Sequence, residues 1–246
     1  MDNASVSVVI PVYNSYYSIE EVVCRTIKSL DKINVDYEII LVDDFSKDDS
    51  LRKLNELEER FNVINVISLN DNLGQQTAIK IGMGIAKGDL IVTMDDDLEH
   101  QPEDLILLIN EMYKGYDVVY GVYNNENYPL YRKLGSKLVD LFFTLGLDKP
   151  KKIRVGSYRI INRKILDEIV MDDTPFVYIS AIILRITKNI GNVYVNHRDR
   201  KYGNSNYNLI KLLKLFMNLF YYYKIAGKFS VQSRNPASDI NHNRRA

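Results

Sequence analysis

Three consecutive aspartates, residues 95–97, are the part of this chain best suited to chemistry. They follow residues 89–94, an apolar run that predicts a buried strand. Like charges this close repel one another, and a bound divalent cation would relieve the repulsion while leaving coordination positions for phosphate oxygens. Carboxylate ligands favour Mg²⁺ or Mn²⁺. The alternative is a solvated acidic turn, whose carboxylates favour the N-terminus of a helix that starts near Pro102.

Two earlier apolar runs also end in polar side chains. Residues 6–14 form a β-branched run that ends in Pro11, Tyr13 and Asn14, and residues 37–44 end in paired aspartates. In an open α/β sheet, ligands bind in the crevice outside the carboxyl ends of the strands. The residues that we expect to gather in one cleft are Tyr13, Asp43, Asp44, Asp95 and Asp97. Taken singly, Tyr13 would be an ordinary half-buried aromatic residue, and Asp43 and Asp44 would cap a helix.

The elements that must position these residues alternate between strand and helix periodicity, which is typical of a doubly wound parallel sheet. The expected strands cover residues 6–12, 37–43, 63–69, 89–94 and 118–123, with a short one near 158–161. The expected helices cover residues 48–61, 104–114, 134–145 and 164–169, one region between the turn at 72–74 and Gly88, and one that opens at Ser18. Ser18 to Glu21 has the pattern of a capping box. An apolar segment follows from 178 to 186.

Two known ligand motifs are excluded by their context. Gly82, Gly84 and Gly88 imitate a dinucleotide-binding fingerprint, but they precede a strand instead of following one. The acidic segment is not a calcium loop, because neither the turn glycine nor the closing glutamate of that loop has the required spacing.

The composition is that of an ordinary globular protein. The 246 residues are 46% hydrophobic and 26% charged, and 32 basic residues balance 32 acidic ones, so no overall charge recommends a nucleic acid as partner. The single cysteine, Cys24, excludes an internal disulfide, and no N-terminal signal segment is present, so we expect a cytoplasmic protein. No uninterrupted apolar segment approaches the ~20 residues that a membrane span requires.

The C-terminal region predicts one long amphipathic helix. Its apolar face carries Leu209, Leu212, Leu213, Phe216, Leu219, Phe220 and Tyr223, with Lys211, Lys214 and Asn218 opposite. This face would either pack on the rest of the protein or lie in a membrane interface, with its lysines toward anionic head groups. We therefore divide the chain into an α/β domain that carries the expected site, over residues 1–206, an amphipathic helix over 207–230 and a disordered tail over 231–246.

Five segments of the chain form an ordered set of motifs: Val8–Asn14, Leu41–Asp48, Asn72–Gly74, Met94–Glu103 and Arg200–Tyr207. Together they resemble the family 2 inverting glycosyltransferases of the GT-A fold, and the likeness runs from about Val6 to Phe220. More narrowly, they resemble the branch that uses polyprenyl phosphates, which includes dolichyl-phosphate mannose synthase and bacterial undecaprenyl-phosphate glycosyltransferases. The resemblance implies an α/β, Rossmann-like fold, a UDP- or GDP-sugar donor, a polyprenyl phosphate acceptor, Mg²⁺ or Mn²⁺, and peripheral association with the inner face of a membrane.

The resemblance also implies roles for individual residues. Asp95 and Asp97 match the metal-binding DxD pair, and Glu99 stands where the branch usually has a metal-associated glutamine. The residues that match the nucleotide-sugar site are Pro11, Tyr13, Asn14, Asp43, Asp44, Asn72, Gly74, Asp95, Asp96 and Ser205. Arg132 and Ser136 match the grip on the acceptor phosphate, and Arg200 and Ser205 match a mobile loop that closes over the donor diphosphate. Asp97, Arg200, Arg132 and Ser136 would carry catalysis.

Three positions depart from the family pattern. Ser15 stands where the family usually has glutamate, Tyr123 where the branch usually has arginine, and Asn206 where the synthase has lysine. The loop ending is nearer to bacterial members, which argues against mannose and a GDP donor.

The acceptor is expected to be a phosphate, because a sugar hydroxyl needs a positioned general base. Relatives that glycosylate hydroxyls keep an acidic residue at the start of the helix that faces the donor sugar. Residues 174–183 contain no Asp or Glu, and only Asp172 and Asp173 lie just upstream. The alternatives are transfer to a sugar hydroxyl in polysaccharide or O-antigen assembly, and a non-catalytic sugar-nucleotide-binding module.

Overall fold

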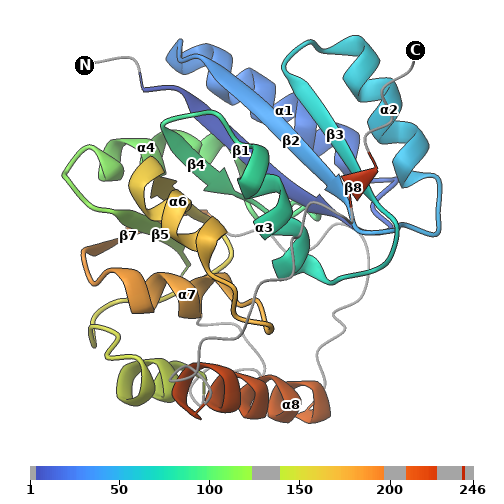
Figure 1. Cartoon of the computed structure of the whole chain (residues 1–246). Coiled ribbons are helices and arrows are strands. Elements are labelled where there is room, and N and C mark those ends of the chain that lie inside the picture. The colour runs from blue at the N-terminus through green and yellow to red at the C-terminus, as the bar shows by residue number, and fades with distance from the viewer. Residues whose placement is uncertain (1–3, 124–138, 197–208, 226–239, 242–246) are drawn as a thin grey trace.

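The structure is a computed structural model, and it describes residues 4–123, 139–196, 209–225 and 240–241 (Figure 1). The predicted boundary between residues 206 and 207 lies outside the described residues. Of the tail predicted to be disordered, only residues 240–241 are described.

The described strands form one eight-stranded sheet in the order β7-β5-β6-β4-β1-β2-β3-β8. The strands are β1 (Val6–Val12), β2 (Tyr37–Asp43), β3 (Ile64–Leu69), β4 (Leu90–Thr93), β5 (Val118–Val122), β6 (Arg159–Asn162), β7 (Ile190–Tyr194) and β8 (Ile240–Asn241). β1 pairs in parallel with both β2 and β4, and β6 runs antiparallel between β4 and β5. The sheet is therefore mostly parallel, as the sequence predicts, and the carboxyl ends of β1, β2 and β4 are neighbours.

Helices cover both faces of this sheet (Figure 1). They are α1 (Ile19–Ile33), α2 (Ser50–Arg60), α3 (Gln75–Ile85), the 3₁₀ turn η1 (Pro102–Asp104), α4 (Leu105–Met112), α6 (Arg163–Met171), α7 (Ile179–Ile186), α8 (Leu209–Phe220) and the π-helical turn η2 (Tyr221–Ile225). Residues 139–146 are also helical. One apolar cluster joins α1, α2 and α4 to the sheet, and a second joins α3, α6 and α7 to the other face. Because helices cover both faces of the sheet, every residue of β1 is buried. This explains why the sequence of β1 is an almost continuous apolar run.

The glycines that imitate a nucleotide fingerprint allow close packing instead. A Cβ on Gly82 would lie 2.6 Å from Cγ1 of Val9, and one on Gly88 would lie 2.6 Å from the backbone nitrogen of Ser7. These two glycines let α3 and the start of β4 approach β1.

The predicted capping box at Ser18 is wrong, although the helix begins where it was expected. α1 starts at Ile19, but the Ser18 side chain accepts no cap hydrogen bond, and its hydroxyl donates to the carbonyl of Ser15 at 3.3 Å. The hydroxyl that the pattern predicts as the helix cap is therefore used for a hydrogen bond within the turn that precedes the helix.

The C-terminal helix α8 packs on the protein beside residues 139–146 (Figure 1). Leu219 and Tyr223 are buried in the second apolar cluster, and Phe142 contacts the rings of both Phe216 and Phe220. The packing alternative is therefore confirmed for the buried side of this helix. Within the described segments, no helix has the length and apolar character needed to cross a bilayer.

Candidate active site

The loops that follow β1 and β4 meet at the carboxyl edge of the sheet. The carboxylate of Asp96 accepts hydrogen bonds from the backbone N–H of Tyr13 at 3.1 Å and from the hydroxyl of Ser15 at 2.5 Å. The pKa of Asp96 is raised to about 7, mainly by burial and also by the neighbouring charges of Asp95 and Asp97, while the two hydrogen bonds act to lower it. Asp96 thus connects β1 to β4, and its carboxylate is occupied by that contact.

The carboxylate of Asp95 is held by side chains from two other segments, and its backbone by a third side chain from its own loop. Its Oδ1 accepts from the amide of Gln75 at 2.6 Å, and its Oδ2 accepts from the hydroxyl of Ser157 at 2.9 Å. Nδ1 of His100 accepts from the backbone N–H of Asp95 at 2.9 Å. The direction of this carboxylate is therefore fixed by Gln75 of α3 and by Ser157 of the segment before β6, while His100 holds the backbone of Asp95.

Asp97 and Glu99 are separated by a sharp turn. Leu98 has a φ of +66°, and Oδ1 of Asp97 accepts from the backbone N–H of Glu99 at 3.0 Å. The three expected metal ligands form no ready-made cage, since the described residues contain no cluster of three or more metal-ligating side chains. Mg²⁺ and Mn²⁺ do not need one, since such ions are held by one or two carboxylates together with substrate phosphates and water. Asp95 and Asp97 fit that donor set, and the role of Glu99 stays a prediction.

The paired aspartates after β2 support backbone turns. The carboxylate of Asp44 accepts from the N–H groups of Leu73 at 2.7 Å and Gly74 at 2.9 Å, and that of Asp43 accepts weakly from Ser46. Asn72 adds a bond from its amide to the carbonyl of Asp44 at 3.1 Å. Asp44 therefore supports the turn that precedes α3. The alternative in which Asp43 and Asp44 cap a helix is wrong, because the N-cap residues of α2 and α3 are Asp49 and Gly74. Burial raises the pKa of both carboxylates above the usual range.

Asn14 joins the loops after β1 and β2. Its backbone N–H donates to the hydroxyl of Ser46 at 3.0 Å, and its side-chain oxygen accepts from the N–H of Lys47 at 2.7 Å. Pro11 lies within β1, opposite Val42 of β2. The structure thus brings the expected nucleotide-site residues of β1, β2, the 72–74 turn and β4 to one edge.

A cleft of about 200 Å³ opens beside these carboxylates, over β5 and the approach to β6. It is lined by Glu99, His100, Gly121, Val122, Tyr123, Arg154, Val155, Gly156 and Ser157. The guanidinium of Arg154 donates to the carbonyl of Tyr123 at 3.0 Å. Tyr123 departs from the branch's usual arginine, and Arg154 brings a guanidinium to the same cleft.

Four expected site residues, Arg132, Ser136, Arg200 and Ser205, lie outside the described residues. Asp172, which could have served as a base, accepts from the backbone N–H of Thr174 at 3.0 Å and lies 3.5 Å from the guanidinium of Arg185, near the end of α7. The opposite end of α7 is the one near the site, where the N–H of Ile179 donates to the side chain of Gln76 at 3.1 Å.

Sequence reasoning missed four site residues: Gln75, His100, Arg154 and Ser157. His100 stands inside the acidic motif, three residues after Asp97, and its spacing was a usable signal. Ser157 is distant in sequence and reaches Asp95 only because β6 pairs with β4. No local pattern could reveal that pairing.

Comparison with known proteins agrees with this geometry. Residues 7–170 match the family model Glycosyl transferase family 2. Two curated relatives are both named undecaprenyl-phosphate 4-deoxy-4-formamido-L-arabinose transferase. The one from Proteus mirabilis is 35% identical over 219 residues, covering 87% of this chain and 66% of the relative. The one from Pseudomonas fluorescens is 33% identical over 220 residues, covering 87% and 63%. The chain thus spans slightly less than two thirds of the length of these relatives.

Solved structures show a GT-A-like fold. Glucosyl-3-phosphoglycerate synthase from Mycobacterium tuberculosis, in complex with Mn²⁺, UDP and glucosyl-3-phosphoglycerate, has a TM-score of 0.63 at 18% identity, over 89% of this chain and 80% of that one. Mannosyl-3-phosphoglycerate synthase from Rubrobacter xylanophilus has a TM-score of 0.67 at 16% identity, over 94% and 77%. At such identities the likeness speaks for the fold alone. The family match covers well over half of the sequence, and this chain belongs to glycosyl transferase family 2.

Proposed function

We propose that this protein transfers a sugar from a nucleoside diphosphate donor to a polyprenyl phosphate, with inversion, at the inner face of a membrane. The observation that carries the proposal is the start of α7, where residues 174–183 offer no carboxylate and Asp172 is committed to Arg185. A phosphate acceptor arrives ionised and needs no general base, whereas a sugar hydroxyl does. The curated relatives, by name, act on undecaprenyl phosphate.

On the donor side, Asp95 and Asp97 would hold Mg²⁺ or Mn²⁺. When bound, the ion would neutralise the diphosphate leaving group. Gln75 and Ser157 would keep the Asp95 carboxylate in place, and Arg200 and Ser205 would close over the diphosphate. UDP is the first nucleotide to test, since a structural neighbour was solved with UDP and Mn²⁺.

On the acceptor side, the cleft beside Asp95 would receive the lipid phosphate. Arg154 lines it, and a guanidinium is suited to phosphate because its planar fork meets two oxygens at once. Arg132 and Ser136 would complete the grip.

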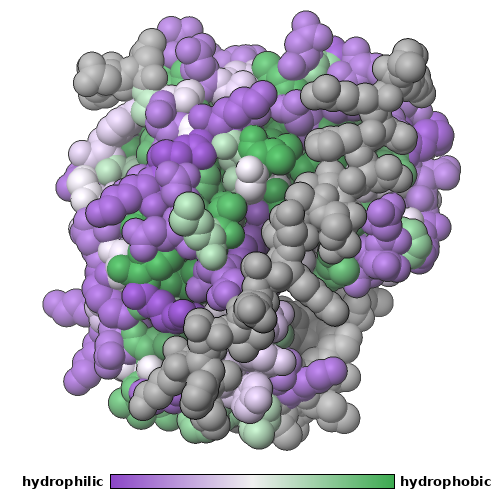
Figure 2. Space-filling view, in the orientation of Figure 1, coloured by the Kyte–Doolittle hydropathy of each residue, from purple (hydrophilic) through white to green (hydrophobic). Residues whose placement is uncertain are grey.

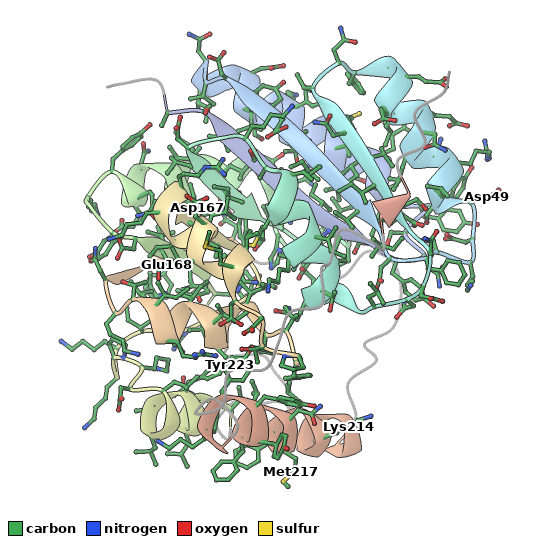
Figure 3. The ribbon with its side chains drawn as sticks, in the orientation of Figure 1. Asp49, Asp167, Glu168, Lys214, Met217 and Tyr223 are labelled. Atoms are coloured by element: carbon green, nitrogen blue, oxygen red, sulfur yellow. The ribbon has the colours of Figure 1, made fainter. Side chains whose placement is uncertain are left out.

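A surface of two helices supports membrane association. Exposed apolar side chains of residues 139–146 and of α8 and η2 gather at the lower edge of the molecule, away from the sheet (Figure 2). They are Leu141, Leu145, Met217, Phe220 and Tyr221, and we call them the two-helix surface. In Figure 3, Tyr223 of η2 lies on the side that faces α7, and Met217 of α8 extends from the opposite side. Lys214 and Lys224 are exposed near them and would favour anionic head groups.

The test offers radiolabelled UDP- and GDP-sugars with Mn²⁺ to three acceptors: undecaprenyl phosphate, undecaprenol and free oligosaccharides. Label in an acid-labile glycosyl phosphate, formed only with undecaprenyl phosphate, is the expected result. Label found only in an oligosaccharide would establish transfer to a hydroxyl. Neither transfer nor metal-dependent donor hydrolysis would leave a non-catalytic binding module.

A further inference from the structure

Phe45 has an unusual backbone conformation for a bulky residue. It follows the paired aspartates of β2 with a φ of +62°, the left-handed region that side chains other than glycine and asparagine seldom adopt. Asp43 and Asp44 are 1% and 3% exposed, but Phe45 is 36% exposed. An aromatic ring therefore stands at the surface directly after two buried carboxylates.

Hydrogen bonds on both sides impose this conformation. The N–H of Asp44 donates to the carbonyl of Val12 at 2.8 Å, and its carboxylate holds the 72–74 turn. After Phe45, Lys47 donates from its N–H to the Asn14 side chain at 2.7 Å. The backbone between these anchors must turn left-handed, and glycine would do so without strain. The turn alone therefore gives no reason for an aromatic ring, and strain retained beside a site points to a function for the side chain.

The surroundings of the ring suit a flat aromatic ligand. The ammonium of Lys47 lies 3.1 Å from the centroid of the Phe45 ring and supports one face of it. Tyr13 and Leu73, which follow the neighbouring strands β1 and β3, are also large apolar residues left exposed. Three such side chains thus stand at three adjacent strand ends, next to the carboxylates of Asp43 and Asp44.

We propose that Phe45 stacks on the base of the donor nucleotide, with the base against the ring face opposite Lys47. This inference rests on the proposed function and adds a specificity-determining residue to its donor site. Every nucleobase has a flat π-face, so stacking would strengthen the binding of a nucleoside diphosphate and leave that of a bare diphosphate unchanged.

The test compares the Phe45→Asn and Phe45→Tyr variants with the unmodified protein. Asparagine tolerates the left-handed backbone and removes the ring, whereas tyrosine keeps the ring. Calorimetric titration with Mn²⁺ present measures the affinity for UDP, for GDP and for inorganic pyrophosphate, and thermal unfolding is recorded alongside. We expect Phe45→Asn to bind UDP and GDP about tenfold more weakly or worse, to bind pyrophosphate as before and to melt no lower. Phe45→Tyr should bind all three normally.

The control is Tyr17→Ala. It removes a more exposed aromatic ring, in the segment just before α1, and should change no affinity. Equal loss of UDP and pyrophosphate affinity in Phe45→Asn, or no loss of either, would overturn the stacking role. Such a result would leave the proposed function intact, since that function is tested separately, by whether the unmodified protein transfers label from a nucleotide sugar to undecaprenyl phosphate.

Discussion

His100 and Asp95 hold each other in a fixed arrangement at the end of β4. Because Nδ1 of His100 accepts from the N–H of Asp95 at 2.9 Å, the neutral ring carries its proton on Nε2, which lies 3.6 Å from Oδ2 of Asp95. The ring is buried and stacks on Tyr158, with centroids 4.8 Å apart and planes 18° apart. His100 therefore contacts both the backbone and the carboxylate side of one residue.

His100→Phe should weaken Mn²⁺ binding about tenfold, because the ring stays stacked while both nitrogens are lost, and partners that orient metal ligands typically contribute 10–100-fold. His100→Asn, which offers an acceptor to the same N–H, should lose less. Electron paramagnetic resonance of free Mn²⁺ measures the affinity without any turnover. Tyr158→Phe is the control, and equal Mn²⁺ affinities in all variants would contradict a role for the imidazole.

Asp97→Ala should lower transfer by on the order of 10²-fold or more, with little change in melting temperature, because in the proposed function Asp97 holds the metal that neutralises the leaving diphosphate. The initial rate with saturating donor measures this. Asp49→Ala, at an exposed position before α2 (Figure 3), should leave the rate unchanged. Full activity of the unmodified protein in excess EDTA would refute the metal requirement.

Asp96→Asn should abolish a pH dependence of stability in the metal-free protein. The folded-state pKa of about 7 lies above the ordinary 3.8, so the folded state keeps a proton that the unfolded state releases. Stability therefore falls as the pH rises from about 4 to about 7, by about 4 kcal/mol at most. Chemical unfolding at a series of pH values in EDTA measures it. The asparagine variant should show a flatter profile and be the more stable protein at pH 8; parallel profiles would contradict the assignment.

Arg154→Ala should raise the KM for the lipid phosphate about tenfold and leave the KM for the donor unchanged, since the guanidinium lines the cleft beside the carboxylates and not the nucleotide edge. Steady-state kinetics with each substrate varied in turn separates the two constants. Lys152→Ala removes a nearby exposed positive charge and serves as control. Equal KM values for both variants would mean that Arg154 does not bind the acceptor.

The double variant Met217→Glu and Phe220→Glu should reduce recovery on anionic vesicles in flotation, because it places charges within the two-helix surface. Leu219→Ala, on the buried side of α8, should instead lower the free energy of unfolding by about 2–5 kcal/mol. If the unmodified protein stays in the soluble fraction with and without anionic lipid, the surface has another purpose.

The sequence predicts best the strands that are mostly buried. β1 and β4 are buried throughout and β2 is buried from Ile39 to Asp43, and all three were expected at nearly their observed bounds. β7 was missed because Ile190–Tyr194 contains glycine and asparagine and is only partly buried, so its pairing with β5 defines it as a strand. The three adjacent aspartates predict a cation site, but no periodicity in the sequence reveals which of the three is used for a contact within the protein.

Contacts with a distant segment show that Asp96 is the aspartate used within the protein. Asp96 is occupied by Ser15 and by the N–H of Tyr13, both from the loop after β1. Ser15 had stood out only as a departure from the family pattern. In the structure, its hydroxyl donates a hydrogen bond to the carboxylate of Asp96. This contact joins two loops, so neither motif taken alone could predict it.

The hydroxyl of Tyr223 joins η2, the π-helical turn that continues α8, to the segment before α7. It accepts from the N–H of Tyr178 at 3.0 Å and donates to the carbonyl of Phe176 at 2.8 Å, and it is buried. An amide whose partner belongs to another helix exchanges its hydrogen with solvent only when that helix moves away. The hydrogen-exchange rate of the Tyr178 amide therefore reports how often the C-terminal helix separates from the segment before α7, and it can be compared with and without lipid.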